Sequence, residues 1–287
     1  MESFDAAAIG CRAVALYALL SALGLAIVPL WAPAAARTEQ EWLGAQQRRF
    51  ALAAVVLTVA HSTLDVARLS GSWTDFLDLR VERLVWGSHA GLVSLVCAVG
   101  LGALAVRDTA QRAFGRLLPG LAFGAVVASF ALVGHTSERS FPLALRWLIP
   151  MHVALLAFWI GGLKLLLHMA CRQSVPDLAA AAASFSAVAV WLVPLIGVAG
   201  LGAASLLVQP SQILTTSYGR SLLLKMVFYL ALLVIATFNR VLLVPQLARQ
   251  RRPKLTHLRY AVTTELILLV AALVITASLT TLFGPPS

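Results

Sequence analysis

The sequence predicts an all-α, polytopic membrane protein built as a bundle of about eight transmembrane helices. Composition supports this: hydrophobic residues make up 60% of the 287 residues and charged residues 12%, against about 45–50% and about 25% in ordinary soluble domains. The apolar residues gather in long runs that short basic segments separate. Because so few charges cannot cover the surface of a soluble core, most of the chain is expected to lie in a lipid bilayer.

Eight runs contain the roughly 20 apolar residues that a transmembrane helix needs. They cover residues 9–31, 50–68, 84–106, 117–136, 147–170, 185–208, 221–244 and 261–283. No connection between them has the length of a soluble domain, so a single helical transmembrane domain is predicted over residues 1–287. Glu2 and Asp5 precede the first run, which is longer than the apolar core of a signal peptide, and a retained helix is therefore expected.

Lys and Arg are unevenly distributed between alternate connections. The connections after runs 1, 3, 5 and 7 hold twelve, namely Arg37, Arg48, Arg49, Arg107, Arg112, Arg116, Arg172, Arg249, Arg251, Arg252, Lys254 and Arg259. The other connections hold six, namely Arg68, Arg80, Arg83, Arg139, Arg146 and Arg220. Because cytoplasmic loops carry the excess, both termini are predicted to lie on the outer side of the membrane. The basic residues behind the net charge of +10 are then explained by the orientation of the protein in the membrane. Nucleic acid is therefore not an expected partner.

Four consecutive predicted helices each carry one histidine near the outer membrane boundary. His61 lies about two turns before the outer end of its run, His89 and His152 lie about five residues inside theirs, and His135 ends its run. At 1.5 Å per residue, all four fall within roughly 10 Å of that boundary. Since ionisable residues inside a membrane mark functional sites by default, we predict a cluster of four imidazoles near the outer face.

The residue types in this cluster suit a transition-metal ion such as copper or zinc. Imidazole suits copper and zinc, while thioether and thiolate sulfur suit Cu(I). Asp65 follows His61 by four residues on the same helix face, so its carboxylate is expected to orient the imidazole or to bind the ion directly. Met151, beside His152, is a candidate additional ligand. Cys97, eight residues inward of His89, is a candidate relay, with a structural thiol as the alternative.

Structural interpretations compete with the functional ones. His135 precedes a polar segment and is also typical of a solvated loop residue. His168, near the inner side, is a candidate exit ligand, and Glu265 is predicted to pair with Arg240, with proton movement as the alternative. The pair Gly161–Gly162 predicts a close approach of helices, because small residues mark packing faces in membranes.

Three segments in order resemble the CopD family of bacterial copper resistance and copper uptake membrane proteins. The stretch from Met151-His152-Val153 to Trp159-Ile160-Gly161-Gly162-Leu163 is similar to the family's His-to-Trp-x-Gly-Gly helix. The segments Thr216–Arg220, followed by Lys225, and Phe238–Arg240, followed by Pro245, agree with it. Together with Gly134-His135-Thr136, they cover about residues 130–250.

The resemblance implies copper passage across the inner membrane, usually inward from the periplasm and often beside a small soluble copper carrier of the CopC type. This chain departs from fused family members because it has no such carrier domain and no Met-rich or His-rich external loop. We therefore expect lipids as direct partners and a separate periplasmic carrier only by implication.

The leading hypothesis is a copper permease that is not an enzyme. The sequence contains no P-loop, so coupling to ATP is not expected, and the ion gradient or the membrane potential would drive transport. A b-type haem protein for electron transfer is one alternative, because histidines on antiparallel helices can also hold haem. A copper-binding sensor or assembly protein without transport is another.

Overall fold

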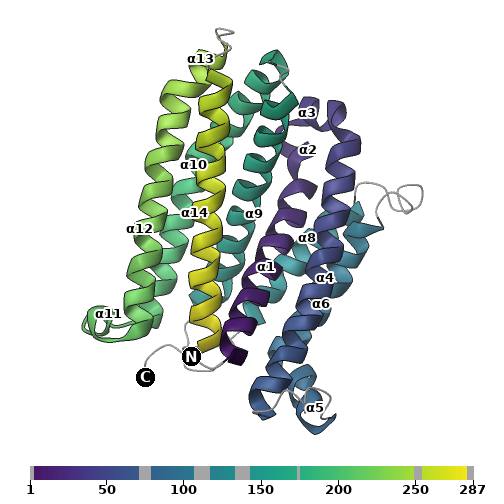
Figure 1. Ribbon diagram of the computed structural model, residues 1–287, viewed down its shortest axis with the longest axis vertical. Helices are drawn as coiled ribbons and strands as arrows, with labels where there is room; N and C mark the ends of the chain where they lie inside the picture. The colour runs from purple at the N-terminus through teal and green to yellow at the C-terminus, as the bar shows by residue number, and fades with distance from the viewer. Residues whose placement is uncertain are drawn as a thin grey trace.

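The computed structural model describes residues 3–70, 79–106, 117–132, 143–172, 175–248 and 254–282, and every element within these ranges is helical. The helices form an elongated bundle with their axes roughly along its long direction (Figure 1). The predicted all-α fold is confirmed, and the apolar helices are those of a multi-pass membrane protein.

Six helical stretches are long and apolar enough to cross a membrane, and each coincides with a predicted run. Their elements are α1 (Ser3–Ala26) with α2 (Val28–Trp31), α4 (Gln40–Ser70), α9 (Leu143–Arg172), α10 (Val175–Leu207), α12 (Ser217–Phe238) continued by η3 (Asn239–Leu243) and α13 (Val244–Ala248), and α14 (Lys254–Leu282). The short helices α3 (Pro33–Thr38) and α11 (Gln212–Thr215) lie in connections.

The other two predicted runs have a different form. The run at 84–106 is divided between α5 (Leu79–Gly87) and α6 (His89–Ala105), which meet at an angle of 75°. Ser88 separates them, and its hydroxyl accepts a hydrogen bond from the Gly91 amide at 3.2 Å, a standard helix N-cap. The run at 117–136 contains α8 (Leu117–Ser129) and the turn η1 (Phe130–Leu132). Within the described residues, six helices are therefore candidate spans, or seven if the bent pair α5–α6 forms one span, where the sequence predicted eight.

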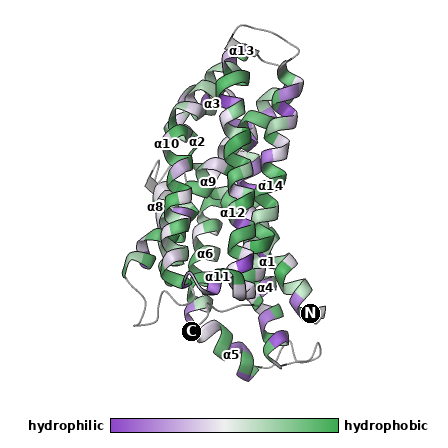
Figure 2. Ribbon diagram, turned by 90° about the vertical axis from the view of Figure 1, so that its left-hand side faces the viewer, coloured by the Kyte–Doolittle hydropathy of each residue, from purple (hydrophilic) through white to green (hydrophobic). Residues whose placement is uncertain are grey.

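Both described ends of the chain lie at the same end of the bundle, close to α5 and α11 (Figure 1). Arg68 links them directly, since its guanidinium contacts Asp5 Oδ1 at 3.2 Å and the Thr281 carbonyl oxygen at 3.0 Å. Hydrophobic residues cover most of the length of the helices, and hydrophilic residues concentrate toward the two ends (Figure 2). This distribution is expected for a bundle embedded in a bilayer.

Helices α1 and α9 pack closely at the centre of the bundle. A Cβ atom on Gly24 of α1 would lie 2.8 Å from Gly161 Cα and still closer to the Ala157 carbonyl oxygen. A Cβ atom on Gly162 would overlap the Phe185 ring of α10. The prediction that Gly161 and Gly162 permit close helix packing is therefore confirmed, and α9 joins the first half of the chain to the second.

Candidate metal site

A cavity of about 120 Å³ lies toward the end of the bundle that holds the two described termini. Residues of α1, α4, α5, α6 and η1 line it, among them Arg12, His61, Asp65, Gly91 and Cys97. We refer to it as the His61 cavity. His61 is nine residues before the end of α4, about 14 Å along the helix axis, so the cavity lies below the surface of the bundle.

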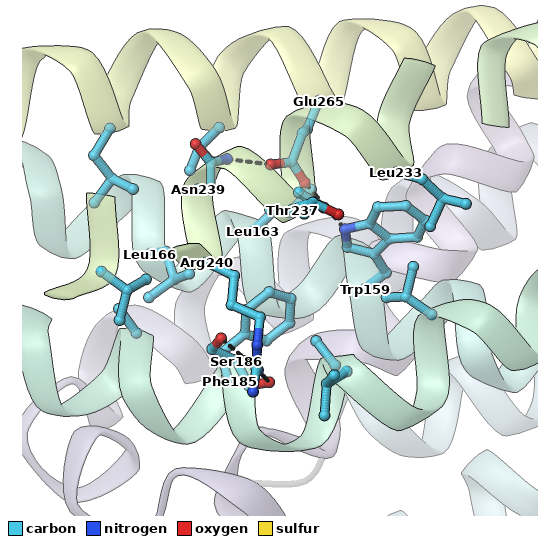
Figure 3. A pocket seen from close by; sticks show the side chains of 18 of the residues that line it. Trp159, Leu163, Leu166, Phe185, Ser186, Leu233, Thr237, Asn239, Arg240 and Glu265 are labelled. Atoms are coloured by element: carbon cyan, nitrogen blue, oxygen red, sulfur yellow. Dashed lines mark hydrogen bonds between the residues drawn. The ribbon is translucent and has the colours of Figure 1, made fainter. Parts of the chain in front are cut away.

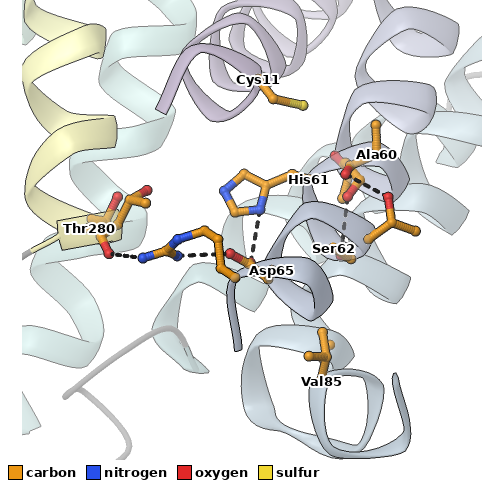
Figure 4. A network of polar contacts seen from close by, with 12 residues as sticks. Cys11, Ala60, His61, Ser62, Asp65, Val85 and Thr280 are labelled. Carbon is orange, nitrogen blue, oxygen red and sulfur yellow. Dashed lines mark hydrogen bonds and ion pairs between the residues drawn. The ribbon is translucent and has the colours of Figure 1, made fainter. Parts of the chain in front are cut away.

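His61 is paired with a carboxylate on its own helix. Its Nδ1 lies 2.9 Å from Asp65 Oδ2, one helical turn further along α4 (Figure 4). If Nδ1 carries the proton and donates a hydrogen bond to the carboxylate, then Nε2 carries the lone pair of the neutral imidazole. Among the described residues, Nε2 is buried and has no hydrogen-bond partner. A carboxylate that fixes the tautomer and leaves the second nitrogen free is the usual support of a histidine that binds a metal.

Asp65 is held in place by a cation as well as by His61. Arg68 Nη1 donates to Asp65 Oδ1 at 3.1 Å, and the same guanidinium contacts Asp5 on α1 and the Thr281 carbonyl oxygen on α14. Three helices thereby fix the carboxylate that orients the imidazole. The positive charge of Arg68 compensates that of Asp65, whose side chain is 31% exposed.

Cys97 lies in the wall of the His61 cavity that α6 contributes. It is buried, and its Sγ lies 3.8 Å from Ser129 Oγ. His89, the first residue of α6, is exposed and does not line the cavity, although the next two residues do. His135 lies outside the described residues.

His152 lines a different cavity of about 110 Å³ between α9, α10, α12 and α14. Its Nδ1 lies 3.2 Å from the Ile196 carbonyl oxygen, and Lys225, Met226 and Tyr229 line the same space. We refer to it as the His152 cavity. Met151 is exposed and does not line this space.

The structure thus brings together part of the predicted cluster. His61, Asp65 and Cys97 share one cavity, whereas His152 lines a second one. Within the described ranges, no three His, Cys, Asp or Glu side chains are arranged to hold a metal ion. Equal depth in the membrane does not fix the direction in which a side chain leaves its helix, and this direction separates His152 from His61. The full cluster, including His89 and His135, stays a prediction.

A third cavity, of about 150 Å³, contains a group of polar residues whose arrangement the sequence did not predict. Glu265 of α14 is 2% exposed and accepts hydrogen bonds from Trp159 Nε1 at 3.2 Å and from Asn239 Nδ2 (Figure 3). Asn239 begins η3, a π-helical segment of the kind often found at functional sites. We refer to this space as the Glu265 cavity. Trp159 belongs to the Trp-x-Gly-Gly motif and Asn239 to the Phe-Asn-Arg motif. These two motifs were the sequence features that could have indicated this group of residues.

The expected pairing of Glu265 with Arg240 is not formed. Arg240 Nη1 donates instead to the carbonyl oxygen and to the hydroxyl of Ser186 on α10, the latter at 2.8 Å (Figure 3). Asn239 and Arg240 are adjacent on a helical segment and therefore point in different directions, so only Asn239 contacts Glu265. Within the described part of the chain, Glu265 has two neutral donors and no ion pair.

His168, the candidate exit ligand, is held at the opposite end of the bundle from the termini. Its Nε2 lies 3.0 Å from Glu39 Oε2, and its ring stacks on Trp42 with centroids 3.9 Å apart. Arg172 contacts the same carboxylate at 3.1 Å. These contacts join α9 to α4 and support a structural role for His168.

Two family models match the chain. One is described as a copper resistance protein D-like N-terminal domain and matches residues 2–140, and the other as copper resistance protein D and matches residues 179–279. The chain belongs to the CopD family. No curated protein and no solved structure gives a significant match.

Membership of the CopD family identifies a copper resistance membrane protein, which is not a known class of enzyme. The two models divide the cavities between them. The N-terminal model includes His61, Asp65 and Cys97, whereas the CopD model includes Lys225, Asn239 and Glu265. Helix α9, which carries His152 and Trp159, lies between the matched regions. The resemblance found over about residues 130–250 therefore overlaps the CopD match only in its second part.

Proposed function

We propose that this protein is a copper permease of the bacterial inner membrane that captures the ion from the periplasm and releases it toward the cytoplasm. Family membership supports copper as the cargo. The excess of Lys and Arg in the connections at the other end of the bundle supports a periplasmic location for the termini and for the His61 cavity.

The observation that carries the proposal is the free nitrogen of His61. Nε2 is buried, lacks a hydrogen-bond partner among the described residues and lies on an imidazole that Asp65 orients. Leaving a buried polar atom without a partner costs about 1–3 kcal/mol, and a bound cation would remove this cost. The Cys97 thiol in the same cavity adds a donor that favours Cu(I) over harder metals.

The remaining predicted ligands have different positions in this scheme. His89 starts α6, whose next two residues line the His61 cavity, and His135 follows η1 in the sequence; both are proposed to complete the ligand set. His152, with Met151 beside it, is proposed as a second ligand position, because it lines a cavity separate from that of His61. A periplasmic carrier of the CopC type is the proposed source of the ion.

Copper binding to the full-length protein in detergent, measured by competition with a chelator, tests the capture site. His61→Ala removes the proposed first ligand and is expected to lower copper affinity by about 100-fold or more, beyond the 10–100-fold typical of losing an outer-shell partner. His257→Ala is the matched control, because His257 is exposed near the start of α14, and no change is expected. Unchanged affinity in His61→Ala would falsify the capture site.

Two further readouts separate the alternative functions. Copper uptake into proteoliposomes should be slower with His61→Ala than with His257→Ala, and binding without any uptake by the unmodified protein would favour a sensor or assembly protein. A Soret band in the purified protein would favour haem. The placement of His61 and His152 in separate cavities argues against a haem held between these two residues.

A further inference from the structure

The His152 and Glu265 cavities lie one after the other along the bundle axis. The same four helices, α9, α10, α12 and α14, contribute to both. On α9, His152 lines one cavity and Leu163 lines the other, and Trp159 between them lines both. On α14, Leu269 to Thr276 face the first cavity and Leu258 to Glu265 the second. Trp159, which is 1% exposed, is the residue common to both linings, and we refer to it as the Trp159 partition.

Glu265 lies at this partition, far from both ends of its helix. It is 11 residues from Lys254 and 17 from Leu282, which corresponds to about 17 Å and about 26 Å along the axis of α14. Bulk water is therefore distant on both sides. A carboxylate at this depth is costly unless its charge is compensated, and such residues are typical of proton relays in transporters.

The surroundings of Glu265 leave its charge without a cationic partner. Trp159 and Asn239 donate hydrogen bonds to it, and both are neutral. Arg240 is the other charged residue of the cavity lining, and Ser186 accepts its hydrogen bonds. Apart from Glu265 and Arg240, the described residues that line the cavity contain no charged or titratable side chain.

Nearby cations on the packed helices have other contacts. Lys164 of α9 lies over the Phe50 ring, 3.7 Å from its centroid, and over the ring of Tyr17 on α1. Arg259, six residues before Glu265 on α14, donates to the Ala170 carbonyl oxygen at 3.0 Å. Neither residue lines the Glu265 cavity.

The donor set favours a proton over a metal ion. Carboxylate and amide oxygens are hard ligands that suit magnesium, calcium or manganese better than copper. In addition, the Asn239 Oδ1 atom is buried and has no hydrogen-bond partner among the described residues. If the Asn239 amide turns over, this oxygen can accept the hydrogen bond that a protonated Glu265 would donate.

We propose that Glu265, at the Trp159 partition between the two stacked cavities, takes up and releases a proton during the transport cycle and so couples copper movement to the proton gradient. The proton comes from water on one side of the membrane, binds a carboxylate oxygen and leaves to water on the other side or on the same side. No other bond is made or broken. The coupling rests on the proposed permease function, whereas the proton site itself does not.

Copper uptake by the full-length protein in proteoliposomes, measured at a fixed membrane potential with and without a pH difference, tests the coupling. A pH difference of one unit can support about a tenfold copper gradient for each coupled proton, so a change in accumulation of up to about tenfold is expected. Glu265→Gln keeps the size of the side chain and removes the titration, and its accumulation is expected to be the same with and without the pH difference. Glu41→Gln, at an exposed carboxylate in the first turn of α4, should respond as the unmodified protein does.

Infrared spectroscopy tests the proton site without copper. The C=O band of a protonated carboxyl group should change with pH in the unmodified protein and in Glu41→Gln, and this component should be missing in Glu265→Gln. An identical pH response of the band in Glu265→Gln would overturn the proposal, as would a Glu265→Gln protein that still responds fully to the pH difference in transport. If the unmodified protein transports no copper at all, the permease function fails while the infrared result still decides the proton site.

Discussion

Two carboxylates that line cavities, the partly exposed Asp65 and the buried Glu265, have opposite electrostatic surroundings. Asp65 lies beside Arg68 and an imidazole, in a cavity toward one end of the bundle. Glu265 lies near the middle of α14, where its partners are the neutral donors Trp159 and Asn239. A compensated carboxylate can remain ionised and hold another group in position, whereas an uncompensated one depends on a proton or another cation.

The comparison assigns different tasks to the two halves of the chain. In the N-terminal half, the polar contacts position His61, whose Nε2 is buried without a hydrogen-bond partner among the described residues. In the C-terminal half, they surround a carboxylate at a partition between two cavities. Capture and coupling would then occur at separate places, joined by the packing of α1 against α9.

The largest expected effect comes from disrupting the packing of α1 against α9, which connects the two halves of the chain. In Gly24→Ala, the new methyl group meets backbone atoms of Ala157 and Gly161, which cannot move away as a flexible side chain can. We expect a loss of about 3 kcal/mol in the free energy of unfolding, measured in mixed detergent micelles. Gly10→Ala is the control in the same helix, because its methyl group meets no atom within 4 Å, and it should be neutral or stabilising by up to about 1 kcal/mol. Equal stability of the two variants would contradict the close packing of α1 and α9.

The next effect separates the tasks of the two carboxylates. Asp65→Asn keeps the size of the side chain but weakens its hold on the His61 tautomer, so copper affinity should fall by about 10–100-fold. Glu265→Gln should leave copper affinity unchanged, because Glu265 lies in another cavity. Chelator competition on the two purified variants gives both values. The distinction fails if Glu265→Gln lowers affinity as much as Asp65→Asn.

The smallest expected effect concerns the charge compensation of Asp65. Arg68→Gln removes contacts to Asp5, Asp65 and the Thr281 carbonyl oxygen, and a loss of about 1 kcal/mol in unfolding free energy is expected because the group is partly exposed. Copper affinity should fall less than in Asp65→Asn, since the His61–Asp65 contact remains. Arg220→Gln, at an exposed position at the start of α12, should change neither quantity. A larger loss of affinity in Arg68→Gln than in Asp65→Asn would show that the cation, rather than the carboxylate, positions His61.

The sequence anticipated part of the candidate site because some of its contacts are local. His61 and Asp65 are four residues apart on one helix, and this spacing alone predicts their contact, which is observed. The predicted pairing of Glu265 with Arg240 failed, because it joins two helices and depends on how each is rotated about its axis. The same uncertainty in rotation applied to His152, which has the predicted depth but lines a different cavity.

By itself, the sequence determined the helical class, the positions of six long apolar helices and the likeness to the CopD family, because hydrophobic run length and local motifs are properties of consecutive residues. Only the tertiary structure decided which side chains share a cavity, that α5 and α6 meet at an angle, and that Trp159 separates two spaces beside Glu265. These features arise from the rotation and packing of helices far apart in the chain. No periodicity within a single helix encodes them.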